Sequence, residues 1–294
     1  PFMSEYNSDF GLSDDELLEL PTVFAADLFK DNVVLVSGGG SGLGKAAAVL
    51  FARLGATIVL CGRTQDRLDA AQELIAGLGV EVMTQAMTIR DADAVNATME
   101  SVWDRFGRLD VLVNNAGGQF PQAAIDFSVK GWNAVIDTNL NGTWYMMQAA
   151  ARKWRDAQET DQNGQAAGNI INMVADIWRG MPGIAHTCAA RAGVVYLSRS
   201  VAVEWAPYGI RVNCVAPGCV ETEAFGLYPP EGSATFPESN PQLHAGDVQD
   251  IAEACVYLAA PSGKFITGEV ITVDGGQQLW GDPWPTGRPD YFKL

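Results

Sequence analysis

One stretch of the chain decides the fold: Val33-Val34-Leu35-Val36-Ser37-Gly38-Gly39-Gly40-Ser41-Gly42-Leu43-Gly44. Its first four residues form an apolar, mostly β-branched run, and helical periodicity extends from Leu43 to Leu54. The pattern therefore predicts a strand, a tight glycine turn and a helix. In such a turn, backbone N–H groups can approach a pyrophosphate at the helix N-terminus, although a glycine-rich turn can also be purely structural. The residues assigned to nucleotide binding here are Ser37, Gly38, Ser41, Gly42, Leu43 and Gly44.

Strands and helices continue to alternate along the rest of the chain. Apolar runs predict strands at residues 33–37, 57–61, 80–89, 111–113, 169–174, 210–215 and 269–273. Helical periodicity predicts helices at residues 43–54, 66–78, 92–106, 131–156 and 184–206. Parallel strands need crossover helices and are buried on both faces, so this alternation predicts an α/β fold. The expected architecture is a single-domain, Rossmann-like, doubly wound parallel sheet of about seven strands.

The chain has 294 residues, a length compatible with one catalytic domain and short extensions. We assign residues 31–280 to a dinucleotide-binding catalytic domain, with an N-terminal appendage at residues 1–30 and a tail at residues 281–294. Within the domain, residues 219–246 are rich in Pro, Gly, Ser and aromatic side chains and are too long for an ordinary connection. We expect this segment to be a substrate lid.

The acidic composition argues against several classes of partner. The chain has 35 acidic and 19 basic side chains, a formal net charge of −16, and only two histidines. Nucleic acids and anionic membranes need basic stripes, and no apolar run reaches the ~18–20 residues of a membrane span, so neither partner is expected. Five cysteines without C-x-x-C spacing argue against disulfides and zinc, and no metal site is expected. No basic and apolar leader opens the sequence, so we expect a cytoplasmic protein.

Arg63 decides the expected cofactor. The second predicted strand ends in Cys61-Gly62-Arg63, where a site for NADH would place an acidic residue against the ribose 2′-hydroxyl. An arginine can instead pair with the 2′-phosphate of NADPH through its forked N–H groups. The sequence therefore predicts NADPH (NADP+) rather than NADH, with a solvated surface arginine as the structural alternative.

Four motifs give the chain a resemblance to a known family. They are Gly38-x-x-x-Gly42-x-Gly44, Asn114-Asn115-Ala116-Gly117, Asn139 within residues 138–143, and Arg211-Val212-Asn213 with Ala216-Pro217-Gly218. Over residues 30–278 the chain resembles the short-chain dehydrogenase/reductase superfamily, which implies a homotetramer or homodimer. Thr88 and Ile89 stand where many relatives carry an aspartate near the adenine. The further cofactor-binding residues in this comparison are Thr88, Ile89, Asn115, Ala116, Gly117, Pro217, Gly218, Val220 and Thr222, the last on the nicotinamide side.

The expected catalytic centre departs from the pattern of that superfamily. Its members usually have a serine and then Tyr-x-x-x-Lys on the following helix, where the lysine lowers the tyrosine pKa and the phenol protonates a carbonyl oxygen. Here Ala175, Thr187 and Arg191 stand at the serine, tyrosine and lysine positions. An aliphatic hydroxyl is a much weaker acid than a phenol, so Thr187 cannot be the usual proton donor.

The missing phenol favours reduction of a carbon–carbon double bond. Reducing a ketone makes an alkoxide and needs a positioned acid, whereas hydride addition to a conjugated C=C bond spreads charge over an enolate. Residues 117–120, 186–194 and 265–268 resemble trans-2-enoyl-CoA reductases, and residues 224–232 are similar to 2,4-dienoyl-CoA reductases. The expected function is NADPH-dependent reduction of a C=C bond conjugated to a carbonyl. The substrate is expected to be small and hydrophobic, with an enoyl-CoA thioester as the leading candidate.

Five side chains are candidates for the catalytic centre: Asn139, Asp176, His186, Thr187 and Arg191. Asn139 is expected to order a water or the substrate oxygen, and Arg191 to hold the nicotinamide ribose and stabilise enolate charge. Asp176 stands fifteen residues before Arg191. The resemblance to 2,4-dienoyl-CoA reductases implies a catalytic tyrosine at this distance before the helix lysine. Asp176 could donate a proton only if burial raises its pKa. His186 has a suitable ordinary pKa. Asn139, Asp176 and His186 each have a structural alternative, and the alternative for Arg191 is an ordinary surface arginine.

Two other functions stay open at this point. A chain with a net charge of −16 is a poor long-range attractor for the phosphates of CoA. A bulky hydrophobic ketone, alcohol or non-CoA enone, steroid-like in character, is therefore a second substrate class. The altered active-site positions leave a non-catalytic nucleotide-binding protein as a third interpretation.

Overall fold

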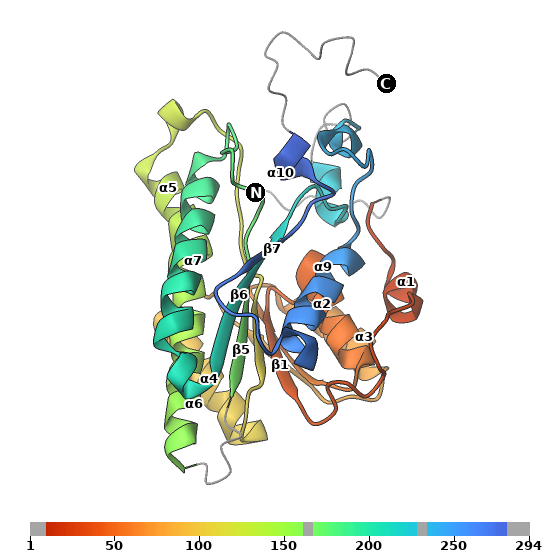
Figure 1. Cartoon of the computed structure of the whole chain (residues 1–294), viewed down its shortest axis with the longest axis vertical. Helices are drawn as coiled ribbons and strands as arrows, with labels where there is room; N and C mark the ends of the chain where they lie inside the picture. Colours follow the sequence, from red (N-terminus) through yellow and green to blue (C-terminus); the bar gives the residue numbers. More distant parts are fainter. Residues whose placement is uncertain (1–9, 161–166, 228–233, 281–294) are drawn as a thin grey trace.

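Seven parallel strands form the centre of the molecule in a computed structural model that describes residues 10–160, 167–227 and 234–280 (Figure 1). They are β1 (Val33–Ser37), β2 (Thr57–Gly62), β3 (Val82–Ala86), β4 (Val111–Asn114), β5 (Gly168–Met173), β6 (Ile210–Pro217) and β7 (Val270–Val273). Their order in the sheet is β3-β2-β1-β4-β5-β6-β7, and all neighbours are parallel. The predicted doubly wound α/β fold is confirmed.

Helices cover both faces of this sheet (Figure 1). One layer contains α2 (Gly42–Arg53), α3 (Gln65–Ala76) and α9 (Val248–Ala259), and the other contains α4 (Ala92–Phe106), α6 (Thr143–Thr160) and α7 (Ala185–Glu204). Successive side chains of a strand point to opposite faces, so Val34 and Val36 join the first hydrophobic cluster and Leu35 joins the second. Burial on both faces explains the continuous apolar run Val33-Val34-Leu35-Val36 of β1.

The prediction of one unbroken helix over residues 131–156 is wrong. The structure has α5 (Val129–Ile136), then a π-helical turn, η2 (Asp137–Gly142), and then α6. The chain passes very close to another segment at this turn, because a Cβ on Gly142 would lie 2.7 Å from Cγ1 of Ile89. Single π turns of this kind occur frequently at functional sites. This one carries the fully buried Asn139.

Two further elements differ from the sequence prediction. No element is predicted for residues 248–259, where the structure has α9. A start signal for this helix was present, because Asp247 and Asp250 form a capping box. The third strand is shorter than predicted, since it ends at Ala86 and residues 87–89 continue beyond the end of β2.

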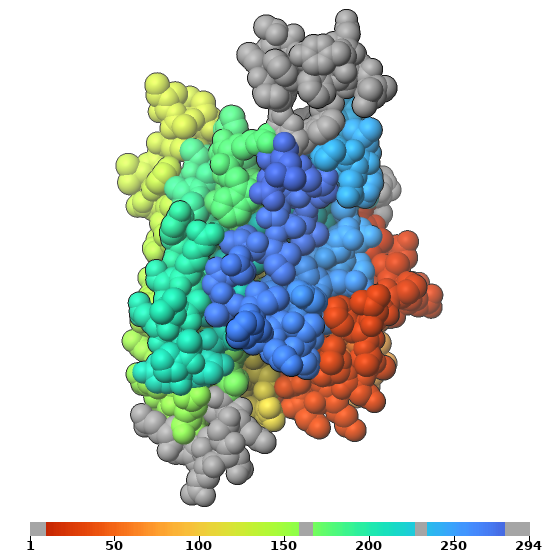
Figure 2. Space-filling model, in the orientation of Figure 1, coloured from red at the N-terminus to blue at the C-terminus, as the bar shows by residue number. Residues whose placement is uncertain are grey.

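The described part of the N-terminal appendage packs on the flank of the domain. Its helix α1 (Asp14–Glu19) lies on α2, where Leu17 is buried and Arg53 Nη1 donates to the backbone oxygen of Leu17 at 3.0 Å. Figure 2 shows this N-terminal part of the chain, in red, beside the blue surface of α9. The appendage is therefore attached to the helix that begins at the glycine loop.

Residues 219–246 leave the sheet and return to the same point. Val220 forms a bridge with Gly246, and the N–H of Glu221 donates to the oxygen of Gly246 at 2.8 Å. The described part of the segment contains two short 3-10 turns, η4 (Glu223–Leu227) and η5 (Phe236–Ser239). Its role as a lid stays a prediction, as do the domain boundaries, and the tail at residues 281–294 lies outside the described residues.

Three negative observations apply to the described ranges. No helix there is both long and apolar enough to cross a membrane. No group of three or more histidine, cysteine, aspartate or glutamate side chains in those ranges could hold a metal ion. All five cysteines are unpaired, and Cys61, Cys214 and Cys255 are buried as small apolar residues.

Candidate active site

The strand order reverses between β1 and β4, and a cavity of about 250 Å³ lies there at the carboxyl ends of the strands. Doubly wound sheets bind their ligands at this reversal. The lining residues that the sequence assigned to cofactor binding are Gly38, Ser41, Arg63, Thr88, Ile89, Asn115, Ala116 and Gly117. Sequence reasoning missed Gly40, Gly62, Thr64, Arg67, Leu68, Met87, Arg90 and Thr138. Several of them could have been predicted from the strand order, because the order β3-β2-β1 places the carboxyl ends of β3 and β2 in a row with that of β1.

The glycine loop has the backbone geometry that the sequence predicted. Gly38 and Gly42 have φ angles of +67° and +53°, in the left-handed region that favours glycine. A Cβ on Gly44 would lie 2.4 Å from the carbonyl oxygen of Gly38, so only glycine allows the helix to pack this closely on the loop. The loop is joined to the neighbouring turn, because Ser37 Oγ accepts from the N–H groups of Asn115 and Ala116 at 3.1 and 3.0 Å. This cradle fits the close approach of a dinucleotide pyrophosphate.

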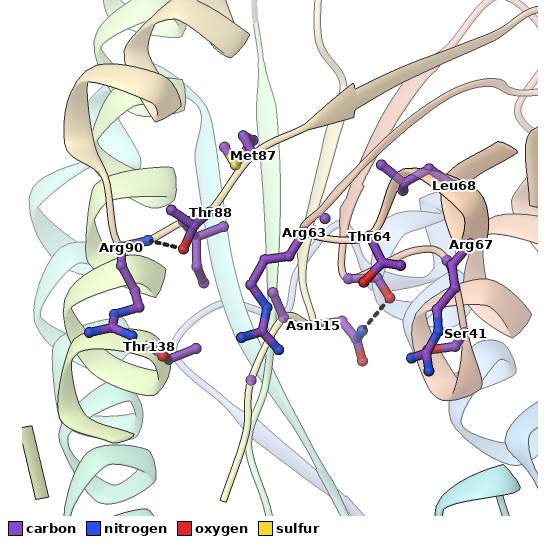
Figure 3. A pocket seen from close by; sticks show the side chains of 16 residues that line it. Ser41, Arg63, Thr64, Arg67, Leu68, Met87, Thr88, Arg90, Asn115 and Thr138 are labelled. Atoms are coloured by element: carbon purple, nitrogen blue, oxygen red, sulfur yellow. Dashed lines mark hydrogen bonds between the residues drawn. The ribbon is translucent and has the colours of Figure 1, made fainter. Parts of the chain in front are cut away.

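Three arginines border the same cavity. Arg63 follows β2, Arg67 belongs to α3, and Arg90 follows β3, and in Figure 3 all three side chains point the same way. Arg90 lies 3.8 Å from a carboxylate oxygen of Asp137, whereas Arg63 has no ion pair within the described residues. The cavity therefore presents positive charge at the end of β2, where the sequence predicts a 2′-phosphate site.

The remaining cofactor candidates lie outside the cavity. Leu43 packs against the first hydrophobic cluster. Pro217 is the last residue of β6, and Gly218 begins the turn that follows. Thr222 and Glu223 lie beside the start of α2, where a Cβ on Gly42 would be 3.9 Å from Thr222 Cγ2 and 3.7 Å from Glu223 Oε2. A carboxylate therefore sits at the helix end that the sequence assigns to the pyrophosphate.

Asn139 is bound to the turn that follows β4. Its Oδ1 accepts from the N–H of Gly118 at 3.1 Å, and its Nδ2 donates to the carbonyl oxygen of Gly118 at 2.7 Å. The side chain is fully buried. In this arrangement Asn139 fixes the position of the Gly117–Gly118 backbone.

Arg191 brings a buried positive charge to that same turn. Its Nη1 donates to the carbonyl oxygen of Met173 at 2.7 Å, and a Cβ on Gly117 would lie 2.3 Å from its Nη2. Burial lowers the pKa of Arg191 to about 10, so the guanidinium stays charged at neutral pH. It forms no ion pair within residues 10–160, 167–227 and 234–280. A buried cation without an acidic partner can stabilise an anion that forms during a reaction.

Asp176 lies just beyond the end of β5, on the side of the site next to β6. Its N–H donates to the carbonyl oxygen of Pro217 at 3.1 Å, and its side chain is half-buried. Burial raises the pKa of the carboxyl above its ordinary value, and the charge of Asp274 raises it further. The positive charge of Arg179 and a backbone N–H from Trp178 act in the opposite direction. Burial and a neighbouring acid thus shift the pKa of Asp176 in the direction that favours the protonated carboxyl.

His186 and Thr187 are enclosed by aromatic rings and helix backbone. The His186 ring stacks on Phe127 with centroids 4.4 Å apart, and Phe120 meets it edge-on at 4.7 Å. Nδ1 accepts from the N–H of Thr187 at 2.8 Å, while the buried Nε2 has no hydrogen-bond partner in the described part of the chain. Burial lowers the pKa of His186, so the ring is neutral near pH 7. This surrounding favours the structural alternative for His186.

Comparisons with known proteins identify the family of the chain. A family model described as enoyl-(acyl carrier protein) reductase matches residues 38–278. A probable 2,4-dienoyl-CoA reductase of Bacillus subtilis is 38% identical over 257 residues, which cover 86% of this chain and 98% of that protein. A peroxisomal 2,4-dienoyl-CoA reductase of Arabidopsis thaliana is 34% identical over 265 residues, 87% of each chain. The structure of a citronellol catabolism dehydrogenase, AtuB, from Pseudomonas aeruginosa PAO1 has 34% identity and a TM-score of 0.76, and the match covers 87% of this chain and 99% of that one.

Proposed function

The chain belongs to the short-chain dehydrogenase/reductase family of oxidoreductases, and from that premise we propose a specific reaction. The protein reduces a C=C bond conjugated to the carbonyl of an acyl-CoA thioester, with NADPH as reductant. The observation that carries this proposal is the makeup of the site, where Thr187 replaces the phenol and Arg191 supplies a buried cation. Relatives named as 2,4-dienoyl-CoA reductases support the same reaction class.

The residues around the cavity support NADPH as the cofactor, which supplies a hydride when it is bound. Arg63, Arg67 and Arg90 would surround the 2′-phosphate, and the Gly38–Gly44 loop would hold the pyrophosphate through backbone N–H groups. Arg191 would hold the nicotinamide ribose in place of the usual lysine. The absence of an acidic residue at positions 62–64 removes the group that would favour NADH.

Arg191 and the Gly117–Gly118 turn stabilise the charge that forms on the substrate. Hydride addition to the conjugated C=C bond moves negative charge onto the thioester oxygen. The buried guanidinium of Arg191 lies close to the Gly117–Gly118 turn, which would border that oxygen. Asn139 keeps the turn in place through its two hydrogen bonds to Gly118. Oriented donors in a water-poor site lower the barrier because they need no reorganisation during the reaction.

Asp176 then gives its proton to the carbon that carries the delocalised charge. The O–H bond of the carboxyl breaks, a C–H bond forms on the substrate, and the carboxylate regains a proton from solvent. His186 is a poorer candidate for this step, because its ring is buried between Phe120 and Phe127 and is neutral. We extend the proposal to a homotetramer or homodimer in the cytoplasm. The oligomeric state rests on the family resemblance and is tested by size-exclusion chromatography with light scattering.

A second candidate function has one specific observation in its favour. The structural relative AtuB is named for citronellol catabolism, which suggests that this chain acts on an alcohol, ketone or enone that carries no CoA. The net charge of −16 also favours an uncharged substrate. A panel of 2,4-dienoyl-CoA, 2-enoyl-CoA, terpenoid and steroid substrates, followed through the absorbance of NADPH, separates the two candidates. Turnover confined to unsaturated thioesters supports the first proposal, and turnover confined to alcohols and ketones contradicts it.

A further inference from the structure

The N-terminal appendage contacts a segment that follows β6 and is distant from it in the sequence. The N–H of Gly11 donates to Oε1 of Glu221 at 3.0 Å. The Gly11 backbone, with a φ of +84°, also packs directly on this segment. A Cβ at position 11 would lie 3.4 Å from Cα of Thr222 and 3.4 Å from the backbone N of Glu223. A hydrogen bond and a close backbone contact therefore join the appendage to the chain after β6.

An aromatic contact strengthens the same junction. The Phe10 ring lies against the Phe225 ring, with centroids 6.1 Å apart. Phe236 meets Phe225 edge-on at 5.0 Å, and only 8% of the Phe225 surface is exposed. Phe225 belongs to η4, the 3-10 turn that begins at Glu223. Phe10 and Phe236 thus both pack on the buried ring that anchors η4.

Both sides of the junction are also bound to α2 by one cation. Lys45 is the fourth residue of that helix. Its Nζ lies 2.6 Å from a carboxylate oxygen of Asp14 in the appendage and 3.9 Å from a carboxylate oxygen of Glu223 in η4. The appendage, η4 and the first turns of α2 therefore meet at one place, beside the helix end that the sequence assigns to the pyrophosphate.

This junction lies on the other side of the glycine loop from Arg63. The cavity that contains Arg63 is bordered by the glycine loop and by residues that follow β2, β3 and β4. Residues 221–225 follow β6 instead, and they meet the glycine loop at Gly42. A dinucleotide with its adenosine end in the cavity and its pyrophosphate on the loop would therefore direct its second half toward residues 221–225.

We propose that Phe10 is a positioning residue for the cofactor. It holds residues 221–225 against the start of α2 and so strengthens binding of the half of the dinucleotide that lies outside the Arg63 cavity. Phe10 does not touch the cofactor in this scheme. A segment that is already fixed loses less freedom when a ligand binds against it, so its contacts contribute more to affinity. The inference rests on the proposed function only in taking NADPH as the cofactor.

The test is the variant Phe10→Ala in the full chain, with nucleotide binding measured by calorimetry. The two ligands are NADPH and adenosine 2′,5′-bisphosphate, which carries the 2′-phosphate but lacks the second half of the dinucleotide. The dissociation constant of NADPH should rise about 3- to 10-fold, as expected for the loss of one aromatic pair. That of the bisphosphate should change less than about 2-fold. Equal weakening of both ligands, or no weakening of NADPH, overturns the inference.

A second measurement needs no nucleotide. The N–H of Phe225 donates to the carbonyl oxygen of Thr222 at 2.9 Å, so hydrogen exchange of a peptide covering residues 221–227 reports whether η4 is held in place. Exchange in this peptide should be faster in Phe10→Ala than in the parent protein. The matched control is Phe265→Ala, which removes a fully exposed ring from the loop before β7 and should leave this exchange unchanged. Unchanged exchange in Phe10→Ala overturns the inference.

A conservative variant separates positioning from a loss of folding. Phe10→Leu keeps an apolar side chain, so both its NADPH affinity and its exchange should lie between those of the parent protein and Phe10→Ala. It decides the question if Phe10→Ala does not fold. If NADPH binding and exchange change as expected but no unsaturated thioester is reduced, the inference about Phe10 stands and the proposed function is wrong.

Discussion

Replacing Arg63 with alanine should weaken the binding of NADPH far more than the binding of NADH. Arg63 is exposed at the end of β2, lines the cavity, and has no ion-pair partner within the described residues, so its charge is available to a phosphate. A hydrogen bond to a charged group contributes about 1.5–3 kcal/mol. Arg67 and Arg90 border the same cavity and keep part of the positive charge, so the lower half of this range is expected.

In terms of affinity, this free energy corresponds to a dissociation constant for NADPH that rises about 10- to 50-fold. NADH has no 2′-phosphate, and its dissociation constant should change by less than about 2-fold on the same reasoning. The assay is a fluorescence titration with each nucleotide at one fixed ionic strength, because charge interactions at an exposed site depend on salt.

Arg105→Ala is the matched control for this experiment. It removes the same charge from the chain, but Arg105 lies in the last turn of α4 and pairs with Glu81, just before β3, at the amino ends of the strands and away from the cavity at their carboxyl ends. Its effect on NADPH binding should be small. Equal losses for NADPH and NADH in Arg63→Ala, or equal losses of NADPH binding in both variants, would refute the assignment of Arg63 to the 2′-phosphate.

Three other variants test separate parts of the site. Glu223→Gln removes a carboxylate from the start of α2 and should tighten NADPH binding about 2- to 5-fold in the same titration. The reason is that this carboxylate has the same sign of charge as the pyrophosphate, and a charge at a helix N-terminus changes binding by about 0.3–1 kcal/mol. Weaker NADPH binding in the variant would contradict this role. Arg191→Gln should lower kcat for an unsaturated thioester about 100- to 1000-fold, as expected for the loss of a donor that stabilises developing charge, and a loss below about 10-fold would argue against it. Asp176→Asn should raise the Tm at neutral pH but not below about pH 4. The sign follows because the pKa of the Asp176 carboxyl is raised in the folded chain. This group therefore contributes stability to the folded chain below its unfolded pKa, and that stability is lost as the pH rises through its folded pKa. A Tm difference that is the same at both pH values would disprove this reading.

The periodicity of the sequence was sufficient to predict the sheet. Strand runs such as Val33-Val34-Leu35-Val36 are apolar because both of their faces are covered, and this pattern needs no tertiary information. The π-helical turn was not predictable in this way. It depends on the contact between Gly142 and Ile89, which are distant in sequence, whereas local periodicity looks the same for an α-helix and a π turn.

The charged groups of the site also depend partly on tertiary contacts that local sequence does not reveal. Arg63 could be predicted because it directly follows a strand at a known position of the fold. Arg90 could not, since its place in the cavity depends on the pairing of β3 with β2. Burial of His186 depends on Phe120 and Phe127, which come from a different loop.

The most direct test of the proposed reaction follows the fate of the transferred hydrogen. NADPH that carries deuterium at the transferring position of its nicotinamide is incubated with the protein and a 2,4-dienoyl-CoA or 2-enoyl-CoA, and the product is examined by mass spectrometry and NMR. We expect deuterium on a carbon of the former C=C system, with the thioester carbonyl intact. Deuterium on the carbinol carbon of an alcohol formed from a ketone, with every unsaturated thioester left unchanged, would contradict it.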